Sequence, residues 1–211
     1  MKRVLLIVLI AIPSLAFATN YWPLDQGFHA RYSCLEFPEY ELAMDIVGEV
    51  DGWAEYRQFF YEYNEVVSQF SFLLSNDDDG NTWCTGQSLP PDGIDLLYWE
   101  PMIFIPGLLY AGLTWEGDIV VGGTPLHFEF EVLDEGPITV PAGTFYCYHV
   151  TRIWYYNDSP VGEVQQWFAD GVGIVKQSHP GLDQPETYVM MEDYPIPTQK
   201  TTWGSMKALF R

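Results

Sequence analysis

Basic residues are scarce in this sequence. Its 211 residues include nine Lys and Arg against 29 Asp and Glu, which gives a formal net charge of −20. Proteins that bind phosphate backbones draw their affinity from clustered Lys and Arg, so we expect no nucleic-acid partner. Such a strongly acidic composition is instead typical of a solvated surface that keeps an exported protein soluble.

Cysteine is also scarce, with Cys34, Cys84 and Cys147 alone in the chain. No two of them have the close spacing of a zinc knuckle, and the four histidines are scattered, so we predict no metal and no cofactor. Export favours oxidation, and an odd number leaves at least one thiol outside any internal bridge. We therefore predict one disulfide bond. All three pairings stay open, with a slight preference for Cys34 with Cys84.

Long apolar runs are missing except at the amino terminus, which reads "MKRVLLIVLIAIPSLAFATN". A charged start, an apolar core from Val4 to Ile12 and a small-x-small site ending at Ala18 are the three parts of a secretory signal peptide. The run is shorter than the roughly 20 residues of a spanning helix, and Pro13 interrupts it. We predict cleavage after Ala18, a secreted or periplasmic location, and a protein that is not integral to a membrane.

Alternating apolar and polar residues fill most of the remaining sequence, as in "LHFEFEVL". There Leu126, Phe128, Phe130 and Val132 should share one face of a strand. Similar segments are separated by short turns rich in Gly, Asp, Asn and Pro, without heptads or internal repeats. We predict an all-β fold with minor helical content, an antiparallel meander that forms a curved half-barrel or barrel over residues 19–194. Residues 195–211 read as a separate tail that could form a short amphipathic helix.

Residues 88–113, "SLPPDGIDLLYWEPMIFIPGLLYAGL", break this alternation. Four prolines exclude a long helix, so we expect a loop or short helical turn that crosses the curved sheet. Its large apolar side chains either fill the core or line and lid a ligand cavity. The second interpretation gives the candidate ligand-binding residues Leu97, Trp99, Ile103, Phe104, Leu108 and Leu109.

Two motifs carry a resemblance to a known class. "ITVPAGTFYCYHV" and "WFADGVGIVKQS", after an early "YWPLDQG" and a central "GLTWEGD", resemble a recurrent group of uncharacterised bacterial secreted β-domain proteins. That group is similar in outline to the LolA-like half-barrels, in which a curved sheet leaves an apolar concavity. Gly143 is expected to supply a positive φ at the turn, and Gly171 and Gly173 a bend after Trp167 and Phe168. The resemblance implies an architecture and no catalytic residue.

Catalytic signatures are absent: the sequence has no G-x-S-x-G elbow, and no pair of its many acids stands out. "SNDDDGN" matches part of a calcium loop at Asp77, Asp79 and Gly80, but the closing Glu is missing. A hairpin tip in which Asp and Asn satisfy the backbone explains it better.

Three classes of function stay open. We favour an exported, non-catalytic binding module for an apolar small molecule or a protein segment. The alternatives are a secreted carbohydrate-binding module, which would use aromatic platforms, and a hydrolase with an unrecognised acidic site. The sequence assigns no oligomeric state.

Overall fold

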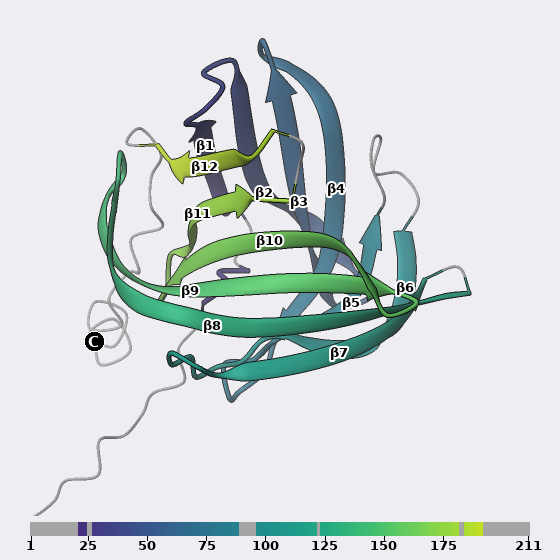
Figure 1. Cartoon of the computed structure of the whole chain (residues 1–211). Coiled ribbons are helices and arrows are strands. Elements are labelled where there is room, and N and C mark those ends of the chain that lie inside the picture. Colours follow the sequence, from purple (N-terminus) through teal and green to yellow (C-terminus); the bar gives the residue numbers. More distant parts are fainter. Residues whose placement is uncertain (1–20, 25–26, 89–95, 122, 182–183, 192–211) are drawn as a thin grey trace, which may run out of the picture.

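The computed structural model describes residues 21–24, 27–88, 96–121, 123–181 and 184–191 as one antiparallel sheet of twelve strands (Figure 1). The strands are β1 (His29–Cys34), β2 (Tyr40–Val50), β3 (Trp53–Glu62), β4 (Glu65–Asn76), β5 (Thr82–Ser88), β6 (Leu96–Ile105), β7 (Thr114–Val121), β8 (Thr124–Val140), β9 (Gly143–Tyr156), β10 (Ser159–Ala169), β11 (Gly173–His179) and β12 (Glu186–Met190). These described residues contain no helix. The predicted all-β class and antiparallel meander are confirmed.

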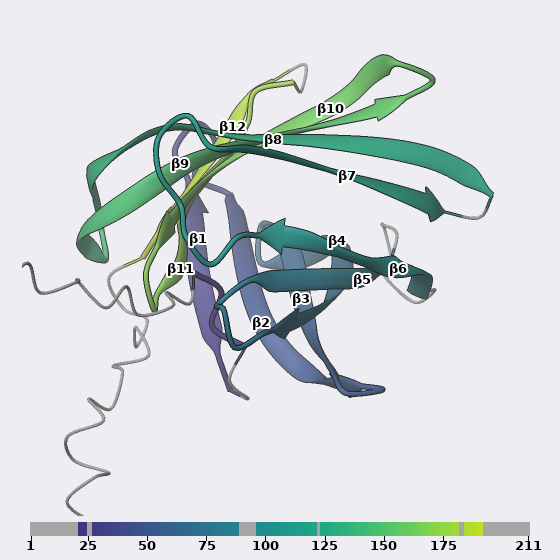
Figure 2. The same ribbon diagram turned by 90° about the horizontal axis from the view of Figure 1, so that it is seen from below.

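The sheet curves until it nearly closes into a barrel. Its strand order is β6-β5-β4-β3-β2-β1-β12-β11-β10-β9-β8-β7. Every pair joins strands that are consecutive in the sequence, except that β1 pairs with β12 and places Tyr32 opposite Met190. The two edge strands, β6 and β7, are themselves consecutive. Figure 2 shows β7 to β10 as one layer above β2 to β6.

The alternating pattern of the sequence decides which side chains fill the barrel. On β8, Phe128, Phe130 and Val132 are buried, while Glu129 and Glu131 between them are exposed. The prediction for this strand is confirmed. At its far end the chain turns through Gly143, whose φ of 141° few other residues adopt.

Strand β6 corrects the prediction made for residues 88–113. The expected loop is wrong for Leu96–Ile105, which pairs with β5 in the sheet. Pro101 is tolerated because β6 is an edge strand and because the register shifts there: Cys84 lies opposite Met102, but Gly86 lies opposite Tyr98. A proline in a sheet is confined to such edges and bulges. Residues 89–95 lie outside the described part.

An amino-terminal plug, defined as Tyr21 and Trp22, fills one region of the barrel. Trp22 is 2% exposed, and its ring lies 4.9 Å from that of Tyr56 and 5.4 Å from those of Phe104 and Phe168. Asn76 Nδ2 donates a hydrogen bond of 2.9 Å to the Trp22 carbonyl oxygen. These contacts explain why the early "YWPLDQG" motif is aromatic: it packs inside the barrel.

The cysteines correct a second expectation. Cys34, Cys84 and Cys147 are buried free thiols, so the structure contains no disulfide bond between Cys34 and Cys84. They lie on β1, β5 and β9, and β2, β3 and β4 separate the first two strands in the sheet. The predicted signal peptide (residues 1–18) and tail (residues 195–211) lie outside the described residues and stay predictions.

Candidate ligand cavity

The barrel contains a partly open cavity of about 500 Å³ between its two layers. This volume falls within the range of about 300–1,000 Å³ that is typical of small-molecule sites. The wall is predominantly apolar and aromatic, with contributions from eight consecutive strands, β4 to β11. It includes Phe70 and Phe72 of β4, Cys84 and Gln87 of β5, Leu97, Trp99, Met102 and Phe104 of β6, Ile119 and Val121 of β7, Leu126 and Phe128 of β8, Arg152 and Trp154 of β9, and Val161, Gly162, Glu163 and Val164 of β10.

The structure separates the six predicted ligand-binding residues into two groups. Leu97, Trp99 and Phe104 lie on the cavity wall, whereas Ile103, Leu108 and Leu109 do not. Ile103 follows Met102 on a strand and therefore faces the opposite side of the sheet. Leu108 is exposed, and Leu109 is buried in the core. Because β6 is a strand, alternate residues of this segment reach the cavity.

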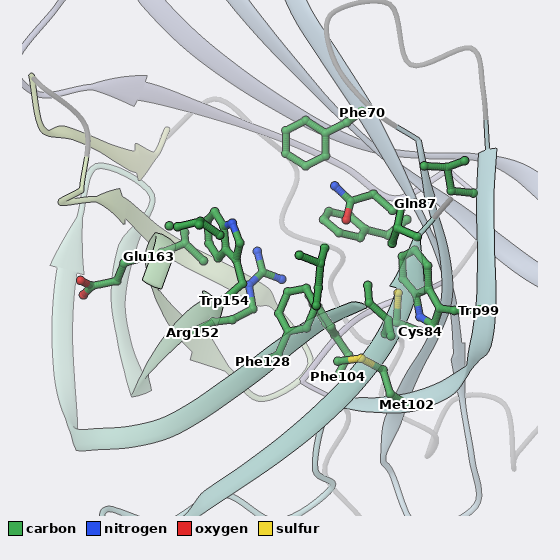
Figure 3. Close-up of a pocket in the computed structure, with 18 of the residues that line it drawn as sticks. Phe70, Cys84, Gln87, Trp99, Met102, Phe104, Phe128, Arg152, Trp154 and Glu163 are labelled. Atoms are coloured by element: carbon green, nitrogen blue, oxygen red, sulfur yellow. The ribbon is translucent and has the colours of Figure 1, made fainter. Parts of the chain in front are cut away.

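Arg152 is the cationic side chain of the wall, and Figure 3 shows its guanidinium group reaching in beside Trp154, above Phe128 and Phe104. It lies on β9 between two inward neighbours, because its partners across the sheet are Phe130 and Val164. Its Cζ atom is 4.9 Å from the centre of the Phe104 ring. Trp154 and Phe72 are at 5.8 and 5.9 Å.

Arg152 has no anionic partner among the described residues. Its Nε atom is buried without a hydrogen-bond acceptor. Glu163, the acid on the wall, instead accepts a hydrogen bond of 2.8 Å from Gln165 Nε2, and its carboxylate points away from Arg152 in Figure 3. Burial raises the pKa of the nearby Cys84 thiol to about 12, so Cys84 stays neutral at pH 7 and supplies no counter-charge.

The desolvation cost of Arg152, a half-buried residue, is opposed by its contacts with three aromatic rings. Cation–π contacts contribute about 0.5–2 kcal/mol each, whereas burial of a charge costs several kcal/mol. The same burial lowers the pKa of Arg152 to about 10, which still leaves the guanidinium protonated at neutral pH. A protonated guanidinium offers five N–H donors in a planar fork. The cavity thus presents hydrogen-bond donors in apolar surroundings.

His179, at the end of β11, lies between this cavity and a second hollow of about 390 Å³. Gln177 Nε2 donates to His179 Nε2 over 2.9 Å. Burial, together with the charge of Arg152, lowers the pKa of His179 to about 4, so it is neutral at pH 7. The second hollow is lined by aromatic rings and by two acids, Glu62 and Glu186. Phe70 and His179 are common to both.

Metal and calcium sites find little support in the geometry. The described residues contain no group of three or more His, Cys, Asp and Glu side chains that could hold a metal ion. Asp77 instead accepts hydrogen bonds from the backbone N–H groups of Asp79 and Asn81 and from Trp83 Nε1, at 2.7 to 2.9 Å. The interpretation of "SNDDDGN" as a hairpin tip that satisfies its own backbone is confirmed.

The described residues also lack a helix with the length and apolar character needed to cross a membrane.

The fold and the cavity define a nearly closed antiparallel β-barrel with an apolar interior. Comparison with known proteins adds that the sequence profile of the DUF3108-like family matches residues 128–179, from β8 to the end of β11. No curated protein sequence matches the chain.

Two crystal structures are similar to this chain. One is a candidate exported protein with a YmcC-like fold from Bacteroides fragilis, 14% identical, with 82% of this chain and 97% of that chain covered and a TM-score of 0.50. The other is a candidate lipoprotein from Parabacteroides distasonis, 14% identical, with 83% and 98% covered and a TM-score of 0.47. The Bacteroides fragilis structure supports the predicted resemblance to bacterial β-domain proteins at the level of the fold. The outline similarity to LolA-like half-barrels stays a prediction.

Proposed function

We propose that this protein is an exported, non-catalytic binding module that holds an apolar small molecule inside its barrel. The observation that carries the proposal is the cavity of about 500 Å³, whose wall is mostly apolar and aromatic. Concave apolar sites of this size bury most of a ligand's surface and obtain their affinity from apolar contact. If the apolar segment of residues 88–113 only filled the core, no such space would be left.

Export is the second part of this proposal. It is supported by the signal-peptide pattern that ends at Ala18 and by the description of the Bacteroides fragilis protein as a candidate exported protein. The two alternative functions have weaker support. Aromatic rings of the wall face into the cavity, among mostly apolar neighbours, and the acid of the wall, Glu163, turns its carboxylate away from the cavity.

The test is a titration with N-phenylnaphthylamine, a neutral apolar fluorophore. Val121 lines the cavity, while its neighbour Val120 is exposed on the outer face of β7. We expect the wild type to bind the probe, Val121→Trp to lose at least tenfold in affinity because the indole occupies the cavity, and Val120→Trp to bind like the wild type.

A wild type that binds neither this probe nor any apolar acid or alcohol would contradict the proposal. Equal loss in both Trp variants would also contradict it, because the probe would then bind outside the cavity.

A further inference from the structure

Two donor atoms on the cavity wall have no hydrogen-bond acceptor among the described residues. They are Arg152 Nε and Trp99 Nε1, on β9 and β6. Buried polar groups are normally paired, so each unpaired group calls for an explanation. Both atoms are N–H donors, which means that the group that would satisfy them must be an acceptor.

The positive charge of Arg152 indicates which kind of acceptor would pair with it. Arg152 carries a full positive charge. Among the other ionisable side chains of the wall, Cys84 and His179 are neutral at pH 7, and Glu163 turns its carboxylate away from Arg152 in Figure 3. A guanidinium fork matches the two oxygens of a carboxylate in a bidentate arrangement, which is stronger than contact with a neutral hydroxyl.

The side chains around Arg152 indicate the chemistry of the rest of the ligand. Around Arg152 the wall is formed by rings and branched aliphatic chains such as Phe72, Phe128 and Ile119. A small ligand that is charged throughout would make no apolar contact with this wall, and a pure hydrocarbon would leave Arg152 without an acceptor. An acid with an apolar chain provides both the apolar contact and the acceptor.

We propose that the cavity binds an alkyl carboxylate and that Arg152 holds its head group while the chain lies against the aromatic wall. This inference rests on the proposed function and specifies its ligand. It assigns to Arg152 a role in specificity that a purely structural residue would not have.

The experiment compares monomeric laurate with lauryl alcohol, which differ in the head group alone, by displacement of N-phenylnaphthylamine and by direct calorimetry at neutral pH. The variants are Arg152→Met, which keeps an unbranched side chain without charge, and Arg31→Met as a matched control. Arg31 lies on β1, half exposed, in an ion pair with Glu41. Unchanged near-ultraviolet circular dichroism verifies folding.

We expect the wild type to prefer laurate to the alcohol by roughly tenfold or more, the range set by a hydrogen bond to a charged group. Arg152→Met should abolish this preference because it lowers the affinity for laurate. The affinity for the alcohol should change by less than about threefold. Arg31→Met should keep the preference. Arg152→Lys, which retains the charge but not the fork, should retain part of it.

Equal affinities for laurate and alcohol in the wild type, or an undiminished preference for laurate in Arg152→Met, would overturn the inference and leave the apolar binding function standing. Should Arg152→Met fail to fold, the comparison of Arg152→Lys with wild type decides: an unchanged preference supports a point charge alone and overturns the bidentate role. Absence of binding for laurate, alcohol and fluorophore together would reject both proposals.

Discussion

His179 shows at the residue scale how burial couples the cavity to pH. Its folded-state pKa of about 4 lies below the ordinary value of 6.5, because burial and Arg152 both disfavour the charged imidazole. Protonation therefore favours the unfolded chain. The stability that the neutral residue provides is complete above pH 6.5 and is lost as the pH falls from about 6.5 to about 4.

We predict that His179→Gln removes this part of the pH dependence, because glutamine does not titrate. Urea melts of the wild type and the variant between pH 7 and pH 4 measure it. The difference in unfolding free energy between the two proteins should change by about 1–3 kcal/mol across that interval. Parallel curves would show that His179 titrates normally in the folded protein.

Arg152 shows how far sequence reasoning extends to the site. Its strand reads "TFYCYHVTRIWYY", in which Arg152 lies on the same face as Val150 and Trp154. Alternation alone therefore predicts that this charged side chain points into the barrel. The absence of a partner could not be read from the sequence. It depends on which side chains of β4, β5 and β6 face β9 across the barrel.

Among the elements, the seam between β6 and β7 is where the barrel lacks a continuous ladder of strand pairing. Met102 of β6 lies over Gly117 of β7, and a Cβ atom built on Gly117 would be 3.6 Å from the Met102 Cβ. This separation falls within the range of about 3.5–4.5 Å that a disulfide bond requires.

We predict that Met102→Cys with Gly117→Cys forms a disulfide across the seam. The bond should stabilise the folded state by about 3 kcal/mol, as for a closed loop of about 15 residues. Thermal melts with and without reductant measure the gain. The substitutions belong in a Cys84→Ala background, because Cys84 lies directly opposite Met102 on β5.

Each single cysteine variant in the same background serves as a control and should respond little to reductant. Free thiols in the oxidised double variant, measured by mass spectrometry after alkylation, would show that β6 and β7 do not approach each other in solution as they do here.

Strand β6 also shows why the type of one element could not be predicted from local sequence. Four prolines in residues 88–113 favoured a loop. The segment from Leu96 to Ile105 is nevertheless a strand, because an edge position and a register shift remove the need for the N–H that Pro101 lacks. Edge positions follow from the order of all strands, which local pattern does not contain.

For the molecule as a whole, the amino-terminal plug is part of the core. Tyr21 is the third residue of the predicted mature chain, so the barrel would be completed by residues next to the cleavage site. We predict that Trp22→Ala lowers the free energy of unfolding by about 3–5 kcal/mol, as expected for a large aromatic residue removed from a packed interior. Urea melts measure the loss.

The control is Trp83→Ala, since Trp83 is half-buried on β5 and donates one hydrogen bond to Asp77. Its loss should be smaller, about 1 kcal/mol for that hydrogen bond plus some apolar contact. Equal effects of the two variants would show that Trp22 does not pack inside the barrel.

The pairing of β1 with β12 has a consequence for how the chain folds. Hairpins between consecutive strands close within microseconds, because the residues they join are near in sequence. The contact between Tyr32 and Met190 joins opposite ends of the described chain and must overcome a far larger loop-closure entropy. We therefore predict that two meanders, β1 to β6 and β7 to β12, form first and that their union limits the folding rate. Before that step β1 and β12 are both unpaired edge strands. A partly folded chain would therefore aggregate through these two strands.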